Sequence, residues 1–268
     1  MARSTARLAK RNREVSPQKE STNLFNSELN DSLIEHAMPI RVIAFDADDT
    51  LWVNETYFRE AEEKFASILE DFLPQHVIMK ELYRTEIGNL GLYGYGIKGF
   101  MLSMIETAIR ISDGQMPISL VEKIIRIGQE MLEKPVELLP GVKDVLQSLQ
   151  GKYRIVLATK GDLVDQERKL QKSGLEGYFH HIEIMSEKRE SDYKKLIVRL
   201  DIQASEFVMI GNSLKSDILP VLELGGYGIH VPFHTTWMHE QVDHEVTHER
   251  FFTAEHLEEA TVRIQSFV

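Results

Sequence analysis

The sequence predicts an α/β protein in which a doubly wound parallel sheet carries an all-helical segment inserted after its first strand. Three observations lead to this prediction. A short apolar run, VIAF at 42–45, ends abruptly in Asp46, Asp48 and Asp49, as a buried strand does on reaching a polar sheet edge. Four amphipathic helical patterns follow between 53 and 135, with no strand among them. From 140 onward, strand-like and helix-like segments alternate, which is typical of a parallel sheet covered on both faces.

The composition limits the class of protein. The chain has 268 residues, 43% of them hydrophobic, enough for one large domain or for a core domain with a smaller one. It contains no cysteine, which excludes disulfides, thiolate zinc sites and a cysteine nucleophile. No apolar run approaches the roughly 18 residues of a membrane span. We therefore expect a soluble, cytoplasmic protein with no membrane partner.

The charge is unevenly distributed along the chain. The net charge is −11, and the acidic surplus lies in residues 38–268. Such an acidic body is a poor general binder of nucleic acid. Residues 1–38 form a polar extension with no acid before Glu14, which we expect to be disordered; a targeting peptide and a tail for an anionic partner are the alternatives. Met38 directly precedes Pro39 and the first strand, which makes it a candidate translation start.

The inserted segment is predicted to form four helices. Residues 55–73 carry apolar side chains at three- and four-residue spacing, and Pro74 opens a second helix expected to reach about 87. Two more are expected over 98–111 and 118–132. The stretch 88–99, GNLGLYGYGIKG, holds five glycines in twelve residues and predicts a loop with unusual backbone freedom. We assign 53–135 to a helical cap domain over the strand ends, and 39–52 with 136–268 to the core domain.

The second half of the chain supplies the rest of the sheet. Helices are expected over 141–150, 163–172, 191–200 and 216–224, and strands over 153–159, 181–185, 207–211 and 228–231. With the first strand they make a parallel sheet of about five strands. In such open sheets, ligands bind outside the carboxyl ends of the strands.

Polar segments follow four of these strands. DADDT at 46–50 follows the first, TKG at 159–161 the second, Lys188 the third, and GNSLKSD at 211–217 the fourth. In this order the segments resemble the haloacid dehalogenase superfamily of hydrolases, whose pattern is Asp-x-Asp-x-Thr, a Thr or Ser, a Lys, and a Gly-Asp with a further acid. The resemblance covers about 40–231. It implies a Rossmann-like core with a helical cap, as in the group that includes phosphoglycolate phosphatase and β-phosphoglucomutase.

The resemblance implies a phosphatase acting on a small phosphorylated metabolite. Asp46 would be the nucleophile that forms an aspartyl-phosphate, and Asp48 the acid and base. The Thr159 hydroxyl and the Lys160 backbone amide would bind the phosphoryl oxygens. Lys188 would take up the developing negative charge; we prefer it to the lysines at 194 and 195 because those fall inside the following helix.

The resemblance also implies a Mg²⁺ cofactor. The ion would be held by the Asp46 carboxylate, the Asp48 carbonyl and the acidic group of the fourth motif. There, Asn212 stands where an acid is expected, so the ion would rest on Asn212, on Asp217, or on both. One fewer formal charge should loosen the ion.

Other functions stay open. The superfamily's dehalogenases cleave carbon–halogen bonds without metal and lack the second Asp; Asp48 favours phosphate-ester chemistry, whereas Asn212 points the other way. A phosphomutase or phosphotransferase would use the same aspartyl-phosphate, and a non-catalytic protein would bind a phosphorylated ligand without turnover. The sequence does not indicate an oligomeric state.

Substrate choice is expected to come from the cap. Tyr93, Tyr95 and Lys98 in the glycine-rich stretch would contact the substrate, or would belong to a mobile connector. PFHTTWMH at 232–239 would form a wall of the pocket or an ordinary surface. Five histidines between 230 and 248 lack the helical His-x-x-x-His spacing of a specific zinc site, and we expect none there.

Overall fold

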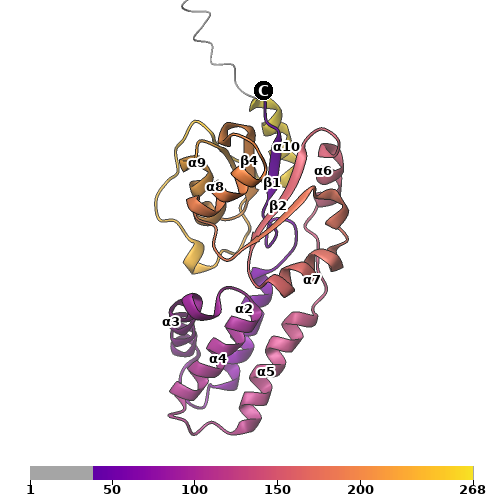
Figure 1. The fold of residues 1–268 in the computed structure, drawn as a ribbon. Helices are drawn as coiled ribbons and strands as arrows, with labels where there is room; N and C mark the ends of the chain where they lie inside the picture. Colours follow the sequence, from indigo (N-terminus) through magenta and orange to yellow (C-terminus); the bar gives the residue numbers. More distant parts are fainter. Residues whose placement is uncertain (1–38, 268) are drawn as a thin grey trace, which may run out of the picture. The chain divides into compact units, whose positions relative to one another are not determined.

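The computed structural model describes residues 39–267 (Figure 1). The expectations for residues 1–38, including a translation start at Met38, lie outside the described residues. Among the helices that the structure describes, none is long and apolar enough to cross a membrane.

The centre of the fold is a six-stranded sheet in the order β3-β2-β1-β4-β5-β6, with every neighbouring pair parallel. Because β1 lies in the middle, the chain adds strands first on one side of it and then on the other, which is the doubly wound arrangement predicted. The strands are β1 (Val42–Phe45), β2 (Arg154–Lys160), β3 (His181–Met185), β4 (Phe207–Gly211), β5 (Tyr227–His230) and β6 (Phe251–Thr253).

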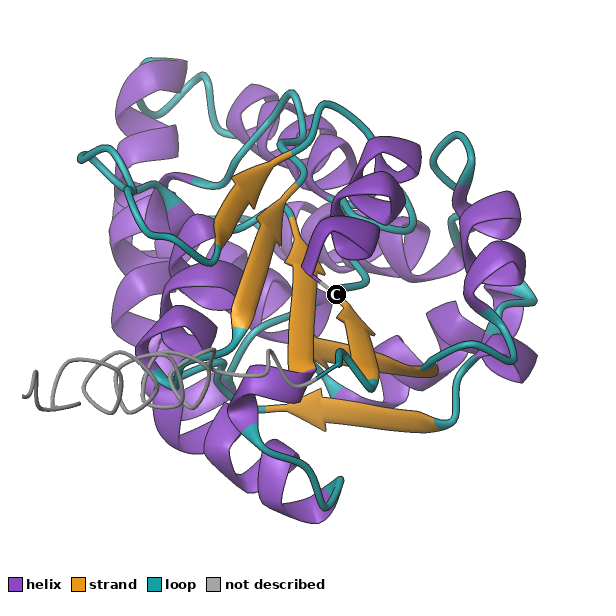
Figure 2. Ribbon diagram, turned by 90° about the horizontal axis from the view of Figure 1, so that it is seen from above, coloured by secondary structure: helices purple, strands orange, loops and turns teal. Residues whose placement is uncertain are grey.

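Helices cover both faces of the sheet (Figure 2). Ile43 and Phe45 of β1 belong to one hydrophobic core with side chains of α6, α7 and α10, whereas Val42 and Ala44 belong to a second core with α8 and α9. This alternation is the two-residue period of a strand buried on both sides. The covering helices are α6 (Val142–Leu149), α7 (Leu163–Ser173), α8 (Glu190–Arg199), α9 (Leu219–Glu223) and α10 (Leu257–Ile264).

Four further helices lie between β1 and α6 in the chain and build a core of their own. Phe65, Ile78, Leu82, Met104 and Ile124 are at most 1% exposed and pack in one cluster that is separate from the two cores of the sheet. The helices appear together in violet to magenta in Figure 1. They are α2 (Glu55–Ile68), α3 (Gln75–Tyr93), α4 (Ile97–Ile111) and α5 (Ile118–Glu133).

The expected loop over 88–99 is wrong for most of its length. Helix α3 continues through Gly88 and Gly91 to Tyr93, and only residues 94–96 form the connection to α4. Each glycine costs a helix about 1 kcal/mol relative to alanine. The packing of Ile78 and Leu82 of this helix in the shared core outweighs that cost, since tertiary burial overrides local propensity.

The expectation of about five strands is also wrong by one. β6 pairs with β5 at the sheet edge, and α10 then returns to pack on the sheet. The strand has only three residues, none fully buried, so it lacks the apolar run that marks the inner strands.

Candidate active site

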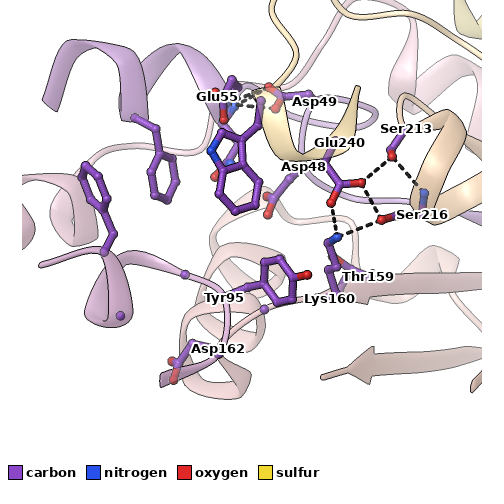
Figure 3. Close-up of a pocket in the computed structure, with 18 of the residues that line it drawn as sticks. Asp48, Asp49, Glu55, Tyr95, Thr159, Lys160, Asp162, Ser213, Ser216 and Glu240 are labelled. Carbon is purple, nitrogen blue, oxygen red and sulfur yellow. Dashed lines mark hydrogen bonds and ion pairs between the residues drawn. The ribbon is translucent and has the colours of Figure 1, made fainter. Parts of the chain in front are cut away.

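A cavity of about 1180 Å³, its mouth included, lies where the carboxyl ends of β1, β2 and β4 meet α2, α3 and α4 (Figure 3). Nine of the ten residues singled out from the sequence line it, and Lys98 does not. The nine are Asp46, Asp48, Tyr93, Tyr95, Thr159, Lys160, Lys188, Asn212 and Asp217. The parallel sheet explains the convergence, because its strand ends all reach the same edge.

A buried lysine joins two buried carboxylates at the base of the cavity. The Nζ of Lys188 lies 2.5 Å from Asp46 Oδ1 and 2.6 Å from Asp217 Oδ1, and all three residues are at most 6% exposed. The two rival lysines, Lys194 and Lys195, are exposed on α8. A charge buried this deeply needs a partner, and Lys188 supplies one to both acids.

The electrostatics of this trio follow from burial and pairing. Burial raises the pKa of Asp46 to about 7 in spite of the lowering effect of the Lys188 ammonium, and the Asp217 carboxylate adds to the rise. Burial by itself would lower the pKa of Lys188, but the two carboxylates hold it well above its ordinary value. Lys188 therefore stays cationic beside the candidate nucleophile.

Local backbone geometry brings Asp217 into the trio. The residues after β4 form a π-helical turn, Leu214–Ile218, a type of turn that is frequent at functional sites. The Asp217 carboxylate folds back over Gly211, where a Cβ would lie only 2.2 Å from its Oδ2. The backbone N–H of Ser213 donates to the same Oδ2 at 3.0 Å. Glycine at 211 is thus a requirement of the site.

Asp48 is held by three donors. Trp52 Nε1 and Lys169 Nζ each lie 2.6 Å from its Oδ1, and Gln166 Nε2 donates to its Oδ2 at 2.8 Å. Sequence reasoning missed Gln166 and Lys169. Their three-residue spacing on α7, directly after the Thr159 strand end, places both on one helix face, and that signal was available.

The donors for a metal ion are mainly uncharged oxygens. The Asn212 side-chain oxygen lies 3.3 Å from Thr50 Oγ1, next to the Asp48 carbonyl and Asp46 Oδ2. If the amide turns over, its nitrogen instead donates to the Asp48 carbonyl at 3.2 Å and to Asp46 Oδ2 at 3.3 Å. Within residues 39–267, no group of three or more His, Cys, Asp or Glu side chains is placed to hold a metal.

These donors fit Mg²⁺ in one amide orientation. A carboxylate, a carbonyl and an amide oxygen are the hard ligands that this ion takes in proteins. In the other orientation the Asn212 nitrogen forms hydrogen bonds in the same place. Asp217 differs from these ligands, because both its oxygens already accept hydrogen bonds from Lys188 and Ser213.

The Lys160 side chain is engaged by the loop after β5. Its Nζ lies 2.5 Å from Glu240 Oε1 and donates to Ser216 Oγ at 2.8 Å, and Ser213 Oγ donates to Glu240 Oε2 at 2.6 Å (Figure 3). Burial would raise the pKa of Glu240, but Lys160 and these hydroxyls outweigh burial and lower this pKa to about 2. The expected role of Lys160, donation from its backbone amide, does not depend on this side chain.

The short connection at 94–96 lies close to the sheet edge. Tyr95 packs edge-on against Trp237 with ring centroids 6.1 Å apart, and its hydroxyl lies 3.3 Å from a Glu187 carboxylate oxygen. Lys98 does not line the cavity, but it forms an ion pair at 2.8 Å with Asp162, which does. Tyr93 lines the cavity, but its hydroxyl donates to a surface carboxylate on α4. Substrate contact by these three side chains stays a prediction.

Further carboxyl groups stand where the helical segment meets β1. Asp49, at φ 60°, accepts hydrogen bonds from the backbone N–H groups of Asn54 and Glu55 at the start of α2. Burial raises the pKa of Asp49 to about 7, and the pKa values of Glu55 and Glu86 to about 8.

Comparisons with known proteins agree with this architecture. Residues 40–225 match the family model described as haloacid dehalogenase-like hydrolase. A solved haloacid dehalogenase-like family hydrolase from Xanthomonas campestris is 38% identical, with a TM-score of 0.76 over 85% of this chain and 91% of that one. The human N-acylneuraminate-9-phosphatase is 23% identical over 197 residues, which are 69% of this chain and 79% of that protein. A 2-haloacid dehalogenase from Pseudomonas syringae shares the fold at 16% identity, with a TM-score of 0.59 over 85% of this chain and 100% of that one.

Proposed function

The chain belongs to the haloacid dehalogenase-like hydrolases, and we propose that within this family it is a Mg²⁺-dependent phosphatase of a small phosphorylated metabolite. The observation that carries the proposal is Asp48. A second carboxylate stands two residues after Asp46, lines the same cavity and is held in place by three donors. Hydrolysis of a phosphate ester through a carboxylate nucleophile needs such an acid and base beside it.

In the first step, an oxygen of Asp46 attacks the phosphorus of the ester. The bond from phosphorus to the alcohol oxygen breaks, and Asp48 gives the leaving oxygen its proton. Lys188 touches Asp46 and remains cationic, so it offsets the negative charge that gathers around the phosphoryl group. The Thr159 hydroxyl and the Lys160 backbone amide bind the phosphoryl oxygens.

In the second step, water attacks the phosphorus of the aspartyl-phosphate. Asp48 takes the proton from the water, inorganic phosphate leaves, and the Asp46 carboxylate is restored. Mg²⁺, when bound, would neutralise part of the charge where carboxylate and phosphate meet. Asp46, the Asp48 carbonyl and the Asn212 amide oxygen are the groups that would hold it, with Asp217 positioned by Lys188 behind them.

We assign residues 53–135 the role of a cap. Helices α2, α3 and α4 contribute to the cavity wall from the side opposite the strand ends, so the substrate body would lie against them. Tyr95 is the member of the connection at 94–96 best placed for this, because its ring lines the cavity and packs against Trp237.

Dehalogenation is the second candidate, and the Asn212 amide is the observation that favours it. When its nitrogen is turned toward Asp46 and the Asp48 carbonyl, this side chain donates hydrogen bonds to both oxygens. These oxygens are then occupied and would not bind a cation. The Asp46 carboxylate would then attack a carbon that bears a halogen, the carbon–halogen bond would break with release of halide, and no metal ion would be needed.

The deciding experiment measures two products. Inorganic phosphate is followed from p-nitrophenyl phosphate and from a panel of sugar, nucleotide and small-acid phosphates, with and without Mg²⁺. Chloride is followed from 2-chloropropionate. The phosphatase proposal predicts Mg²⁺-dependent phosphate release that disappears in Asp46→Asn. Chloride release without phosphate release would establish the second candidate, and a folded, Mg²⁺-loaded protein that releases neither product would refute both.

A further inference from the structure

Three glutamates of the helical segment line the cavity. Glu55 and Glu62 belong to α2, and Glu86 belongs to α3. They are 8%, 8% and 9% exposed, although glutamate is rarely buried without a partner. None of them belongs to the four segments at the strand ends that carry the proposed chemistry.

These three carboxyl groups have few positively charged partners in the described part of the chain. Arg59 pairs with Glu62 at 2.9 Å and lies 3.3 Å from Glu55, and it is the one basic side chain that forms an ion pair with any of the three in the described part of the chain. Glu86 has no hydrogen-bond or ion-pair partner among residues 39–267, and its Oε2 is fully buried. The Oε1 of Glu55 is buried as well, and it lies 3.3 Å from Arg59 Nη2 in an ion pair that does not meet hydrogen-bond geometry.

An unpartnered carboxyl oxygen at the wall of a cavity is costly in the free protein. A buried acceptor that finds no donor costs on the order of 1–3 kcal/mol, and more if the group is charged. Burial raises the pKa of Glu86 to about 8, so an ammonium group bound beside it would also return the carboxyl to its charged form. A ligand that brings positive N–H groups into the cavity would resolve the arrangement, since each N–H can donate to one of these oxygens.

Two aromatic rings line the same cavity as the three acids. Phe58 and Phe100 line the same cavity, with ring centroids 5.2 Å apart. The face of an aromatic ring attracts a cation within about 6 Å, whereas a neutral carbohydrate hydroxyl group gains no such attraction. Carboxylates and aromatic rings together favour an ammonium group over a hydroxyl.

We propose that the cavity selects phosphate monoesters whose alcohol part carries a cationic amine, with Glu86, Glu55 and Glu62 holding the nitrogen. The inference rests on the proposed phosphatase function and deepens it by naming the substrate class. The phosphoryl group lies at Asp46, and the amine lies between α2 and α3.

The test compares esters that differ only in the group in question. Three pairs are aminoalkyl against hydroxyalkyl phosphates with two, three and four carbons, and a fourth is glucosamine 6-phosphate against glucose 6-phosphate. We expect kcat/KM to favour the amine by about tenfold or more in at least one pair, as one charge-assisted hydrogen bond provides. If no pair reaches about fivefold, or if the hydroxyl members are preferred, the inference is overturned.

Variants tie the preference to the glutamates. Glu86→Gln removes the charge and keeps the shape, and we expect it to reduce the amine preference by about fivefold or more. Glu62→Gln gives a second measurement if the first variant does not fold. The matched control is Glu81→Gln, on the same helix, whose carboxylate pairs with Arg110 outside the cavity. An amine preference that survives unchanged in both Gln variants of the cavity would contradict the assignment.

A binding measurement separates this inference from the phosphatase proposal. Asp46→Asn, which cannot form the aspartyl-phosphate, is titrated with each member of the same four pairs by calorimetry. Tighter binding of an amine by about fivefold or more, without turnover by the wild type, would support the inference and refute the phosphatase. Turnover of esters with no amine preference in either assay would support the phosphatase and refute the inference.

Discussion

The charge state of Glu86 leads to a prediction about stability in the absence of substrate. Burial raises the pKa of Glu86 from 4.5 to about 8; Glu62 and Glu55 add to the rise, and Arg59 opposes it. An acid whose pKa is higher in the folded than in the unfolded chain contributes its full stability below pH 4.5, where both states are protonated. Stability then falls as pH rises from there to about 8, because only the unfolded chain ionises freely.

The size of the effect follows from that difference in pKa. At about 1.4 kcal/mol per pKa unit, a carboxyl that titrates near 8 instead of 4.5 costs the folded state up to about 4 kcal/mol at pH 7.5. Glu86→Gln removes the cost because the amide does not ionise. We expect this variant to be more stable than the wild type by roughly 2–4 kcal/mol at pH 8 and by less than about 1 kcal/mol at pH 5.

Urea denaturation of the full chain at pH 5 and pH 8 measures both differences. Glu81→Gln is the control, since its carboxylate pairs with Arg110 and lies outside the cavity. We expect the control to change little between the two pH values. Equal stabilities of Glu86→Gln and the wild type at pH 8, or a gain that is the same at both pH values, would refute the reasoning, because Glu86 would then have a partner that stabilises its charge.

Three other substitutions test the site and the helical segment. Lys188→Met should abolish phosphate release and lower the free energy of unfolding by about 3–5 kcal/mol, because it leaves two buried carboxylates facing each other; unfolding by urea measures this. Asn212→Asp adds a charged ligand, so the Mg²⁺ concentration for half-maximal thermal stabilisation should fall about tenfold. Gly96→Ala, at φ 110° and with its Cβ 3.3 Å from Asp162, should cost about 1–2 kcal/mol of stability in urea denaturation.

Buried strands were predictable because their side chains must be apolar on both faces. The bounds expected for the strands at His181–Met185 and Phe207–Gly211 are those of the structure. Phe251–Thr253 was missed because an edge strand of three partly exposed residues needs no apolar run. The glycines at 88 and 91 led to the wrong prediction of a loop, because a rule based on local sequence takes no account of the burial that stabilises α3.

The meeting of Asp46, Lys188 and Asp217 could be expected for a topological reason. The carboxyl ends of neighbouring parallel strands share an edge, so residues directly after them converge whatever the intervening loops do. The partners of long side chains could not be expected in this way. Lys160 pairs with a carboxylate eighty residues further on, at Glu240, and Lys98 pairs with Asp162, because loops of unpredictable path bring the partners there.

The charges at the two ends of the cavity make opposite demands on a ligand. At the sheet edge, Lys188 offsets part of the charge of Asp46 and Asp217, and Asn212 stands where a further acid would add to it. A doubly charged phosphate meets less repulsion there than it would if residue 212 were also a carboxylate. Three carboxyl groups lie between α2 and α3. Arg59 is the one basic side chain in the described residues that forms an ion pair with any of them. A substrate that is negative at one end and positive at the other satisfies both ends at once. A uniformly anionic ester would add negative charge where burial already disfavours ionised glutamates, and a neutral alcohol would leave the buried glutamate oxygens without a cationic partner.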